Sequence, residues 1–467
     1  MNVFRVCCPA VPRVFRALLP LAVVLVSTSP SRAATLDEIS ALVSELQAAT
    51  AHDRARAAVR LGELGSNANT AIDALIASAL HESDHVVRIR VIRALERISG
   101  RANVTITALI ELLDDPHPEI RWAAAGAMES FGLKAVVATP ALVGLLDDPD
   151  AAVRASAAST LGKMGPVAVA ALMQVLDDSD RAKRLSALKG LAAHGARAGV
   201  AVPRVAPITR DPDPEMRALA LLCLRRIAGD RNWPGESGWL TDPQAQIWPK
   251  AMTSAERLRG YPSLRRAIVE ASLQVFGELV ADPDPRVRYE AVKGFADLGE
   301  DGQSGALLVA PLLRDPDSRI RRATADALGG MGSAAVADLV PELVSALADR
   351  DENVRWAVIQ ALRNVGAGAL TELAIVLEYG DRLLLPGVLA TVIELGPVAA
   401  DTAVYLLPYL ASDDSEVRAL TAEALGSVGA TEAADALHTA LDDQAEEVRL
   451  AAAWALAALG TDVPVMR

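Results

Sequence analysis

The chain has 467 residues, of which 51% are hydrophobic but only 3% are aromatic. This balance favours helices packed through alanine, leucine and valine, and it argues against a sheet core rich in aromatic side chains. The formal net charge of −13 would repel phosphate backbones, which argues against nucleic acid as a partner.

The first 33 residues have the pattern of a secretory signal peptide. A positive region is followed by an apolar run over residues 17–26, which is too short to anchor the chain across a bilayer. The small residues Ser31 and Ala33 predict cleavage before Ala34. We therefore expect an exported protein, periplasmic or extracellular, with no membrane span after cleavage. Its formal charge would be 42 − 59 = −17, because four arginines and no acid precede residue 34.

A motif of about 33 residues is repeated along the remaining chain. In the copy at 137–165, an amphipathic helix is expected over residues 137–146, followed by a second helix that ends near Met164. Asp148 is expected to cap this second helix, with Pro149 in its first turn. Gly165 supplies a residue that can adopt a positive φ. Two sets of apolar residues lie at helical spacing and are predicted to be buried: Leu142, Leu145 and Leu146 on the first helix, and Val153, Ala157, Leu161 and Met164 on the second.

The copies align on an arginine eleven residues before the terminal glycine of each repeat. This position defines twelve repeats with one interruption between the sixth and the seventh. It is occupied by Arg54, Arg88, Arg121, Arg154, Arg184, Arg217, Arg288, Arg321, Arg355, Leu385, Arg418 and Arg449. An acid stands six residues earlier in most repeats: Glu82, Asp115, Asp148, Asp178, Asp211, Asp282, Asp315, Asp349 and Asp443.

The pattern D-P-x-x-V-R-x-x-A-x-x-A-L-x-x-L-G resembles that of HEAT-repeat proteins, in the variant also found in phycobilisome-lyase subunits. The resemblance implies an all-α superhelix, a HEAT-like solenoid of about twelve helical hairpins with one insertion. A hairpin of this size cannot bury its apolar face alone and must stack on its copies. The expected organisation is a signal peptide at 1–33, repeats 1–6 at 34–228, an insertion at 229–262 and repeats 7–12 at 263–467.

The recurring acid and arginine resemble the inter-repeat ladder of such stacks, in which the acid of one repeat bonds the arginine or backbone of the next. A binding surface is the alternative, but a specific site would occur once rather than in most repeats. We therefore interpret as structural the set Asp115, Arg121, Asp148, Arg154, Asp178, Arg184, Asp211, Arg217, Asp282, Arg288, Asp315, Arg321, Asp349, Arg355, Asp443 and Arg449.

Some chemistry-bearing residues resemble parts of two enzyme sites. The string from His81 to His85 matches the H-E-x-x-H motif of zinc proteases, but its alignment places it across the turn between two helices, where two histidines need not share a face. Deoxyhypusine hydroxylase, also built of HEAT-like repeats, holds two irons with several His-Glu pairs, and this chain has one such pair. No metal, cofactor or catalytic residue is therefore predicted. Cys223 is expected to be a buried, inert thiol.

The insertion contains three of the six tryptophans, Trp233, Trp239 and Trp248, among several prolines and glycines. Proline and glycine at this density predict a loop with one short helix. Long loops often carry function and tryptophan is enriched at binding hot spots, so these side chains are candidates for partner binding. Alternatively, these tryptophans cover the exposed edge between neighbouring repeats, and the sequence favours the two interpretations equally.

A second candidate surface uses the position after the arginine, which helical geometry turns away from the buried face. Trp122, Tyr289 and Trp356 occupy it in repeats 3, 7 and 9. These aromatics are expected either to contact an extended partner on the concave surface or to pack against a neighbouring loop.

The last repeats depart from the pattern in two ways. Repeat 10 has Leu385 and Pro386 where the arginine is expected, and no acid at the usual distance, which predicts a softer joint. The last repeat ends with an alanine-rich helix over residues 450–459 that has little polar outer face. Self-association or a partner is expected at this end. Repeat 7, by contrast, keeps the pattern, and its first helix is expected at 263–280.

Taken together, these features predict an exported scaffold that binds a protein or peptide through its concave face and the tryptophan-rich insertion. One alternative is a HEAT-like enzyme, either similar to phycobilin lyases or a metal-dependent oxidoreductase similar to deoxyhypusine hydroxylase. The other alternative is a structural spacer of the cell envelope.

Overall fold

The computed structural model describes residues 35–229 and 261–461, and these residues contain helices and no strand. The chain divides into two compact units, residues 1–100 and 101–467. The division falls between repeats 2 and 3, within the expected block 34–228. There Ser99 and Arg101 have positive φ values of 44° and 42°, which end one helix and precede the next.

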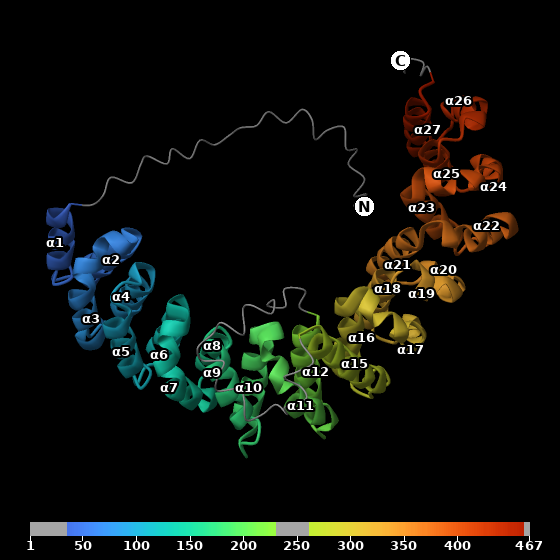
Figure 1. Cartoon of the computed structure of the whole chain (residues 1–467). Coiled ribbons are helices and arrows are strands. Elements are labelled where there is room, and N and C mark those ends of the chain that lie inside the picture. The colour runs from blue at the N-terminus through green and yellow to red at the C-terminus, as the bar shows by residue number, and fades with distance from the viewer. Residues whose placement is uncertain (1–34, 230–260, 462–467) are drawn as a thin grey trace. The chain divides into compact units, whose positions relative to one another are not determined.

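Each repeat forms a hairpin of two helical segments, and the hairpins are numbered 1–12 in chain order (Figure 1). The second helices each include the arginine position. They are α2 (Ala51–Glu63), α4 (His85–Ile98), α6 (Pro118–Ala127), α8 (Ala151–Leu161), α10 (Arg181–His194), α12 (Pro214–Ala228), α16 (Pro285–Leu298), α18 (Ser318–Gly330), α21 (Glu352–Val365), α23 (Leu385–Leu395), α25 (Ser415–Val428) and α27 (Glu446–Ala458).

The first segments are more varied in length. They contain α1 (Leu36–Glu45), α3 (Ile72–His81), α5 (Ala102–Leu112), α7 (Thr139–Gly144), α9 (Pro166–Val175), α11 (Val202–Val205), α15 (Tyr261–Leu279), α17 (Ala306–Val309), α19 (Ser333–Val336) with α20 (Val340–Ser345), α22 (Leu370–Tyr379), α24 (Ala403–Leu406) and α26 (Ala434–Ala440).

Short 3₁₀ helices connect or extend these segments, as is common at α-helix ends. They are η2 (Gly65–Ala71), η3 (Met128–Ala138), η4 (Leu145–Asp147), η5 (Gly195–Ala201), η6 (Ala206–Arg210), η8 (Gly299–Gly305), η9 (Ala310–Arg314), η10 (Ala337–Leu339), η11 (Ala346–Ala348), η12 (Gly366–Ala369), η13 (Gly396–Thr402), η14 (Leu407–Ala411) and η15 (Thr431–Ala433).

Successive second helices pack against one another in chain order. In the first unit α2 packs on α4, and in the second unit the contacts run from α6 through to α27. Within residues 101–461 the second helices form one side of the row of hairpins and the first segments form the other (Figure 1). This stacking is the all-α superhelix that the repeat pattern predicts.

The buried faces follow the predicted helical spacing. Both predicted apolar sets of the copy at 137–165 are buried, and Val153, Ala157, Leu161 and Met164 are completely so. Small residues allow close approach of the second helices, because a Cβ at Gly329 would lie 2.9 Å from Cα of Ala361. The same holds at Gly426, where a Cβ would lie 2.6 Å from Cα of Ala455. The alanine-rich composition therefore reflects helix-to-helix distance.

Three local predictions for this copy are wrong in detail. The second helix, α8, begins at Ala151 and is capped by Asp150, whose Oδ1 accepts hydrogen bonds from the N–H groups of Ala152 and Val153. Asp148 lies before the cap because its carboxylate is used between hairpins, and Pro149 lies outside the helix. The first helix expected at 137–146 is divided into η3, α7 and η4. The second helix ends at Leu161, and Gly165, with φ of 84°, precedes α9.

Two apolar stretches, 118–147 and 385–411, are long and hydrophobic enough by composition to cross a membrane. Neither is one straight helix. Gly132 (φ 52°, ψ −129°) interrupts the first and Gly396 (φ 56°) the second, so each comprises the second helix of one hairpin and the first segment of the next. Their apolar windows are 39% and 50% buried within the fold, as expected for helices of a stacked core.

Candidate partner-binding surface

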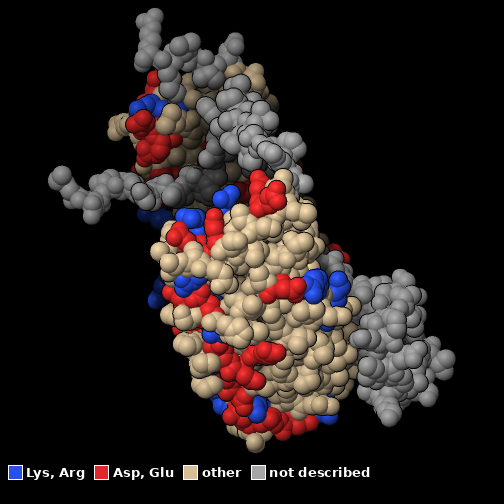
Figure 2. Space-filling model, turned by 90° about the vertical axis from the view of Figure 1, so that its left-hand side faces the viewer, with Lys and Arg blue, Asp and Glu red and all other residues tan. Residues whose placement is uncertain are grey.

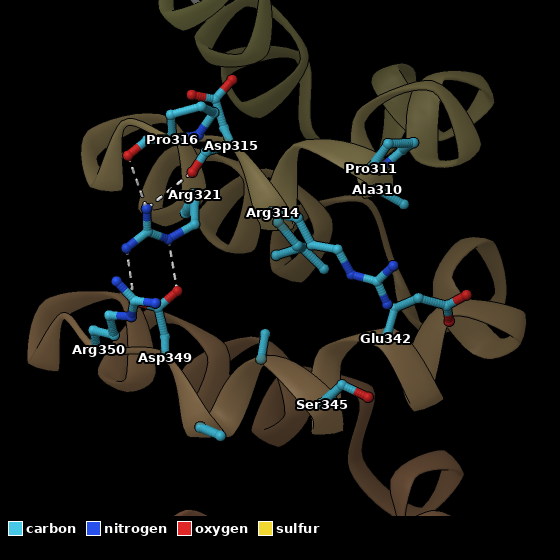
Figure 3. A pocket seen from close by; sticks show the side chains of 13 residues that line it. Ala310, Pro311, Arg314, Asp315, Pro316, Arg321, Glu342, Ser345, Asp349 and Arg350 are labelled. Atoms are coloured by element: carbon cyan, nitrogen blue, oxygen red, sulfur yellow. Dashed lines mark hydrogen bonds and ion pairs between the residues drawn. The ribbon is translucent and has the colours of Figure 1, made fainter.

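The recurring arginines have one bonding geometry, which Arg321 on α18 illustrates (Figure 3). Its Nη1 donates to two carbonyl oxygens of its own turn, Asp315 at 2.9 Å and Pro316 at 3.2 Å. Its Nε and Nη2 donate to both carboxylate oxygens of Asp349 in the next hairpin, at 2.6 and 2.8 Å. The guanidinium thus fixes its own turn and links two hairpins.

The acid has an equally consistent set of partners. One oxygen of Asp349 also accepts the backbone N–H of Asp351, the residue that caps α21. Burial by itself raises the pKa of Asp349, but the hydrogen bonds from Arg321 and from this N–H outweigh it and hold the pKa below its usual value. A carboxylate held in this way is ionised and oriented for structural reasons.

The link runs forward, from the arginine of one hairpin to the acid of the next, which is opposite to the direction expected from the sequence. The bidentate links are Arg54 to Glu82, Arg121 to Asp148, Arg217 to Asp282, Arg288 to Asp315, Arg321 to Asp349 and Arg418 to Asp443. The third of these pairs lies on either side of the insertion, so the ladder continues across that break in the repeat pattern.

Hairpins 4 to 6 are joined differently. Arg154 and Arg184 bond carbonyl oxygens of their own turns and, within the described residues, donate to no carboxylate. Instead, Arg181 at the start of α10 donates to Asp213 and Glu215 of hairpin 6, both at 2.6 Å. Asp178 and Asp211 accept the N–H of the residue two positions ahead and so stabilise their own turns.

Two further ladder positions, Asp115 and Arg449, also bond within their own turns. Asp115 accepts the N–H of His117, and its carbonyl oxygen accepts a hydrogen bond from Arg121. Arg449 bonds the carbonyl oxygens of Asp443 and Gln444 in its own turn. Most of the arginine and acid positions described above stabilise their own turns, and the six bidentate pairs also link neighbouring hairpins.

The aromatic positions on the second helices are more exposed than the ladder. Trp122 on α6 is 38% exposed and Trp356 on α21 is 45% exposed, whereas Tyr289 on α16 is only half-buried. Trp454 on α27 is 41% exposed, beside Leu450 at 57%. Trp454 is not among the aromatics predicted from the sequence, because it does not directly follow the recurring arginine, here Arg449. Every tryptophan within the described residues thus lies partly exposed on a second helix.

The three insertion tryptophans Trp233, Trp239 and Trp248 lie outside the described residues. The first helix of hairpin 7 begins at Tyr261, two residues earlier than predicted. The candidate binding role of the insertion therefore stays a prediction.

A cavity of about 750 Å³ opens between hairpins 8 and 9 on the side of the first segments (Figure 3). The ladder pair Arg321 and Asp349 forms one end of it, and the side chains of Arg314 and Glu342 extend toward each other at the other end. Alanine and proline side chains line much of the rest. The repeat pattern gives no signal for this cavity, since its walls are the variable first segments.

The predicted turn at the H-E-x-x-H string is confirmed. His81 ends α3, His85 begins α4, and Glu82 between them is bonded to Arg54 in the ladder. The residues that the structure describes contain no group of three or more side chains suited to a metal ion. Cys223 is fully buried on α12, and burial raises the pKa of its thiol, as expected for an unreactive cysteine.

Charges are distributed in small groups on the described surface. Figure 2 shows one face, on which acidic groups are separated by wide uncharged areas and basic side chains form no broad patch.

The geometry defines a class: an all-α solenoid of paired helices, joined by an arginine–acid ladder. HEAT repeats match the chain at residues 39–129, 106–173, 273–340, 306–382 and 404–466, which is more than half of its length. The chain belongs to the HEAT-repeat family.

Comparison with solved structures gives similarities that include the following three. Kap121p bound to Nup53p is 15% identical, with a TM-score of 0.49, over 91% of this chain and 54% of that chain. Kap121p bound to Ste12p is 14% identical over the same shares, with a TM-score of 0.49, so this chain spans about half the length of Kap121p. An engineered protein is 20% identical over 56% of this chain and 97% of its own, with a TM-score of 0.36. A comparison with curated proteins finds no match to this chain.

Proposed function

We propose that this protein is a scaffold that binds a protein or peptide along its row of second helices. The observation that carries the proposal is the placement of tryptophan. In a chain with 3% aromatic residues, Trp122, Trp356 and Trp454 all lie 38–45% exposed on second helices. Tryptophan has a large apolar surface that is normally covered, and it is enriched at the centres of protein interfaces.

The distribution of charge supports the same proposal. Most recurring arginines and acids have their bonding groups engaged in turns and links between hairpins, so they hold the helices in place. What varies between hairpins is the outward surface of the second helices. A rigid frame with a variable surface is the arrangement by which helical repeat proteins bind extended partners.

We further propose that the protein acts outside the cytoplasm. The sequence of residues 1–33 supports this location, and the first described helix needs nothing before Thr35, which forms a complete capping box with Glu38. Intact-mass measurement of the protein from its native host tests the proposal. We expect a chain that begins at Ala34, and a mass that retains residues 1–33 would contradict export by this route.

Partner capture from the native envelope, followed by variants, tests the binding function. We expect the double change Trp122→Ala and Trp356→Ala to reduce capture by about tenfold or more, since each hot-spot tryptophan contributes about 2 kcal/mol or more. The matched control is Leu307→Ala with Leu308→Ala on α17, where exposed apolar residues are removed from the other side of the row. Equal loss in both variants, or no specific capture by the wild-type protein, would contradict the proposal.

The same capture assay tests the insertion. Changing Trp233, Trp239 and Trp248 to alanine should weaken capture while leaving helicity unchanged, if the insertion contributes to the same surface. Unaltered capture would confine binding to the second helices.

A further inference from the structure

The cavity between hairpins 8 and 9 is lined by charged side chains of two kinds (Figure 3). The first kind has partners within the fold. Arg321 and Asp349 are joined by their bidentate contact at 2.6 and 2.8 Å, and Asp315 is bonded by Arg288 from the preceding hairpin. These side chains form a fixed wall of the cavity.

The second kind consists of Arg314, Glu342 and Arg350. All three are exposed, and among the described residues their charged groups form no hydrogen bond or ion pair. Arg314 extends from η9 of hairpin 8 toward Glu342 on α20 of hairpin 9, and Arg350 lies at the opposite end, with the ladder pair (Figure 3). Two guanidinium groups and one carboxylate thus line a single cavity without a partner in the described part of the chain.

The equivalent positions of hairpins 5 and 6 contain the same kind of pair in a closed form. Asp177 directly precedes the ladder acid of its hairpin, as Arg314 does. Arg204 lies seven residues before the next ladder acid, as Glu342 does, and each follows a Val-Pro dipeptide at the start of a short helix. Asp177 and Arg204 form an ion pair. The separation of Arg314 from Glu342 is therefore a property of one joint and not of the repeat.

The size and walls of the cavity suit a small molecule. Its volume of about 750 Å³ lies within the range of about 300–1,000 Å³ that is usual for ligand pockets. Pro311, Leu313 and Ala346 contribute apolar surface to the walls. The contact of Arg321 with Asp349 links the two hairpins on either side, so it fixes their separation.

We propose that this cavity binds a short free peptide with an acidic side chain. Glu342 binds the N-terminal ammonium group, and Arg314 and Arg350 bind the two carboxylates. Such a ligand neutralises all three groups that lack a partner, and it is long enough to extend from Glu342 toward the ladder end. The site lies among the first segments and goes beyond the scaffold function, which uses the second helices.

Direct closure of Arg314 onto Glu342 would compete only weakly with such a ligand. An ion pair between exposed side chains contributes little free energy, because water screens both charges. A ligand inside the cavity contacts both charges and the apolar wall at once, and it removes water from all of them.

Isothermal titration calorimetry of the folded protein with the dipeptide Ala-Glu tests the proposal, and we expect saturable binding at neutral pH. Three matched ligands identify the groups that are recognised. Acetylated Ala-Glu lacks the ammonium group, Ala-Gln lacks one carboxylate, and free glutamate is too short to reach both ends. Each should bind about tenfold more weakly than Ala-Glu, as expected for the loss of one charge-assisted hydrogen bond.

Variants test whether the peptide binds in this cavity. Glu342→Gln should weaken binding of Ala-Glu about tenfold but leave binding of acetylated Ala-Glu unchanged, because the ammonium group is already absent. Arg314→Gln should weaken the binding of both peptides. The matched controls are Glu372→Gln and Arg210→Gln, which make the same changes at the equivalent positions of hairpins 10 and 6. Neither control should alter the titrations, and circular dichroism checks the folding of every variant.

The outcomes that would overturn the proposal are distinct. Absence of saturable Ala-Glu binding would reject the site, and equal losses in the control variants would reject its location. Equal affinity for free glutamate would reject the assignment to a peptide, and an unchanged titration in Glu342→Gln would reject the role of the ammonium group. None of these results touches the scaffold function, since Glu342→Gln should leave partner capture unchanged.

Discussion

Hairpins 7 to 9 and hairpins 9 to 11 are built from the same repeat but are held together differently. In the first group, Arg288 and Arg321 each make bidentate contacts with the acid of the next hairpin. In the second group the described residues form no bidentate link: Tyr379 stands at the position of one acid, Asp381 in the same turn is not bonded to Arg355, and Leu385 replaces one arginine. The helices still stack in order, α21 on α23 and α23 on α25.

The second group compensates with a different set of contacts. Leu385 is 4% exposed and so contributes apolar burial where the other repeats have a half-buried charge. The hydroxyl of Tyr409 donates to the carbonyl oxygen of Leu377 at 2.6 Å and connects hairpins 10 and 11. The comparison shows that successive hairpins stack in order without the bidentate ladder contact, through the apolar seam and other links such as Arg363 to Glu394 at 3.5 Å. The ladder adds a fixed orientation between neighbouring turns.

The largest expected difference between the two groups comes from removing a ladder acid. Asp349→Ala leaves the half-buried Arg321 without its carboxylate and removes the acceptor for the N–H of Asp351. We expect a loss of about 2–3 kcal/mol in the unfolding free energy of the surrounding hairpins, because a buried charge is left unpaired. Faster hydrogen exchange of the backbone amides in α18 and α21 would measure this loss of unfolding free energy.

The control for this change is Tyr379→Ala at the equivalent position of hairpin 10. Tyr379 is 81% exposed, so its removal should alter stability by no more than about 0.5 kcal/mol. Similar losses in the two variants would mean that the ladder acid contributes nothing specific.

A smaller effect is expected from the substitute link. Tyr409→Phe removes the hydrogen bond to Leu377 and keeps the ring, so we expect a loss of about 1 kcal/mol. Faster hydrogen exchange at the end of α22 and in η14 would report it. Tyr405→Phe makes the same chemical change on α24, where the described residues show no hydrogen bond to the hydroxyl. It should leave exchange unaltered, and equal effects would reject the proposed link.

The smallest expected difference is in the response to pH. The pKa of Asp349 is lowered, so its contribution is present above the usual carboxyl pKa and is lost as pH falls through the lower folded value. Burial, together with the nearby Glu394, raises the pKa of Glu423 on α25, so the ionised form costs stability at neutral pH. Acidification from neutral pH through this raised pKa should first stabilise hairpin 11, before the ladder of hairpins 7 to 9 weakens.

Hydrogen exchange across this pH range measures both trends. Exchange in α25 should slow as pH first falls, and exchange in α18 should become faster at lower pH. Glu423→Gln, which cannot ionise, should abolish the early stabilisation of hairpin 11 and leave hairpins 7 to 9 unchanged. A pH response of hairpin 11 that persists in this variant would show that another group is responsible.

Several features of the fold follow from the sequence alone. The period of the repeat, the twelve arginine positions and the buried face with Val153, Ala157 and Leu161 predict the paired helices, because helical geometry fixes which residues share a face. Most residues of the ladder were also identified, since a charge that recurs in most copies implies a repeated structural role. The exposed positions of Trp122 and Trp356 follow from the same geometry.

Other features depended on the tertiary structure. The sequence could not tell that Asp150 rather than Asp148 caps α8, because both are acids near the helix start and only the position of Arg121 in the preceding hairpin decides which is engaged. Neither could it show the forward direction of the ladder, the division at Gly100 and Arg101, or the cavity beside Arg314. Local patterns determine helices and their faces, but contacts between residues about 30 positions apart depend on how successive hairpins are rotated. That rotation is set by packing between hairpins.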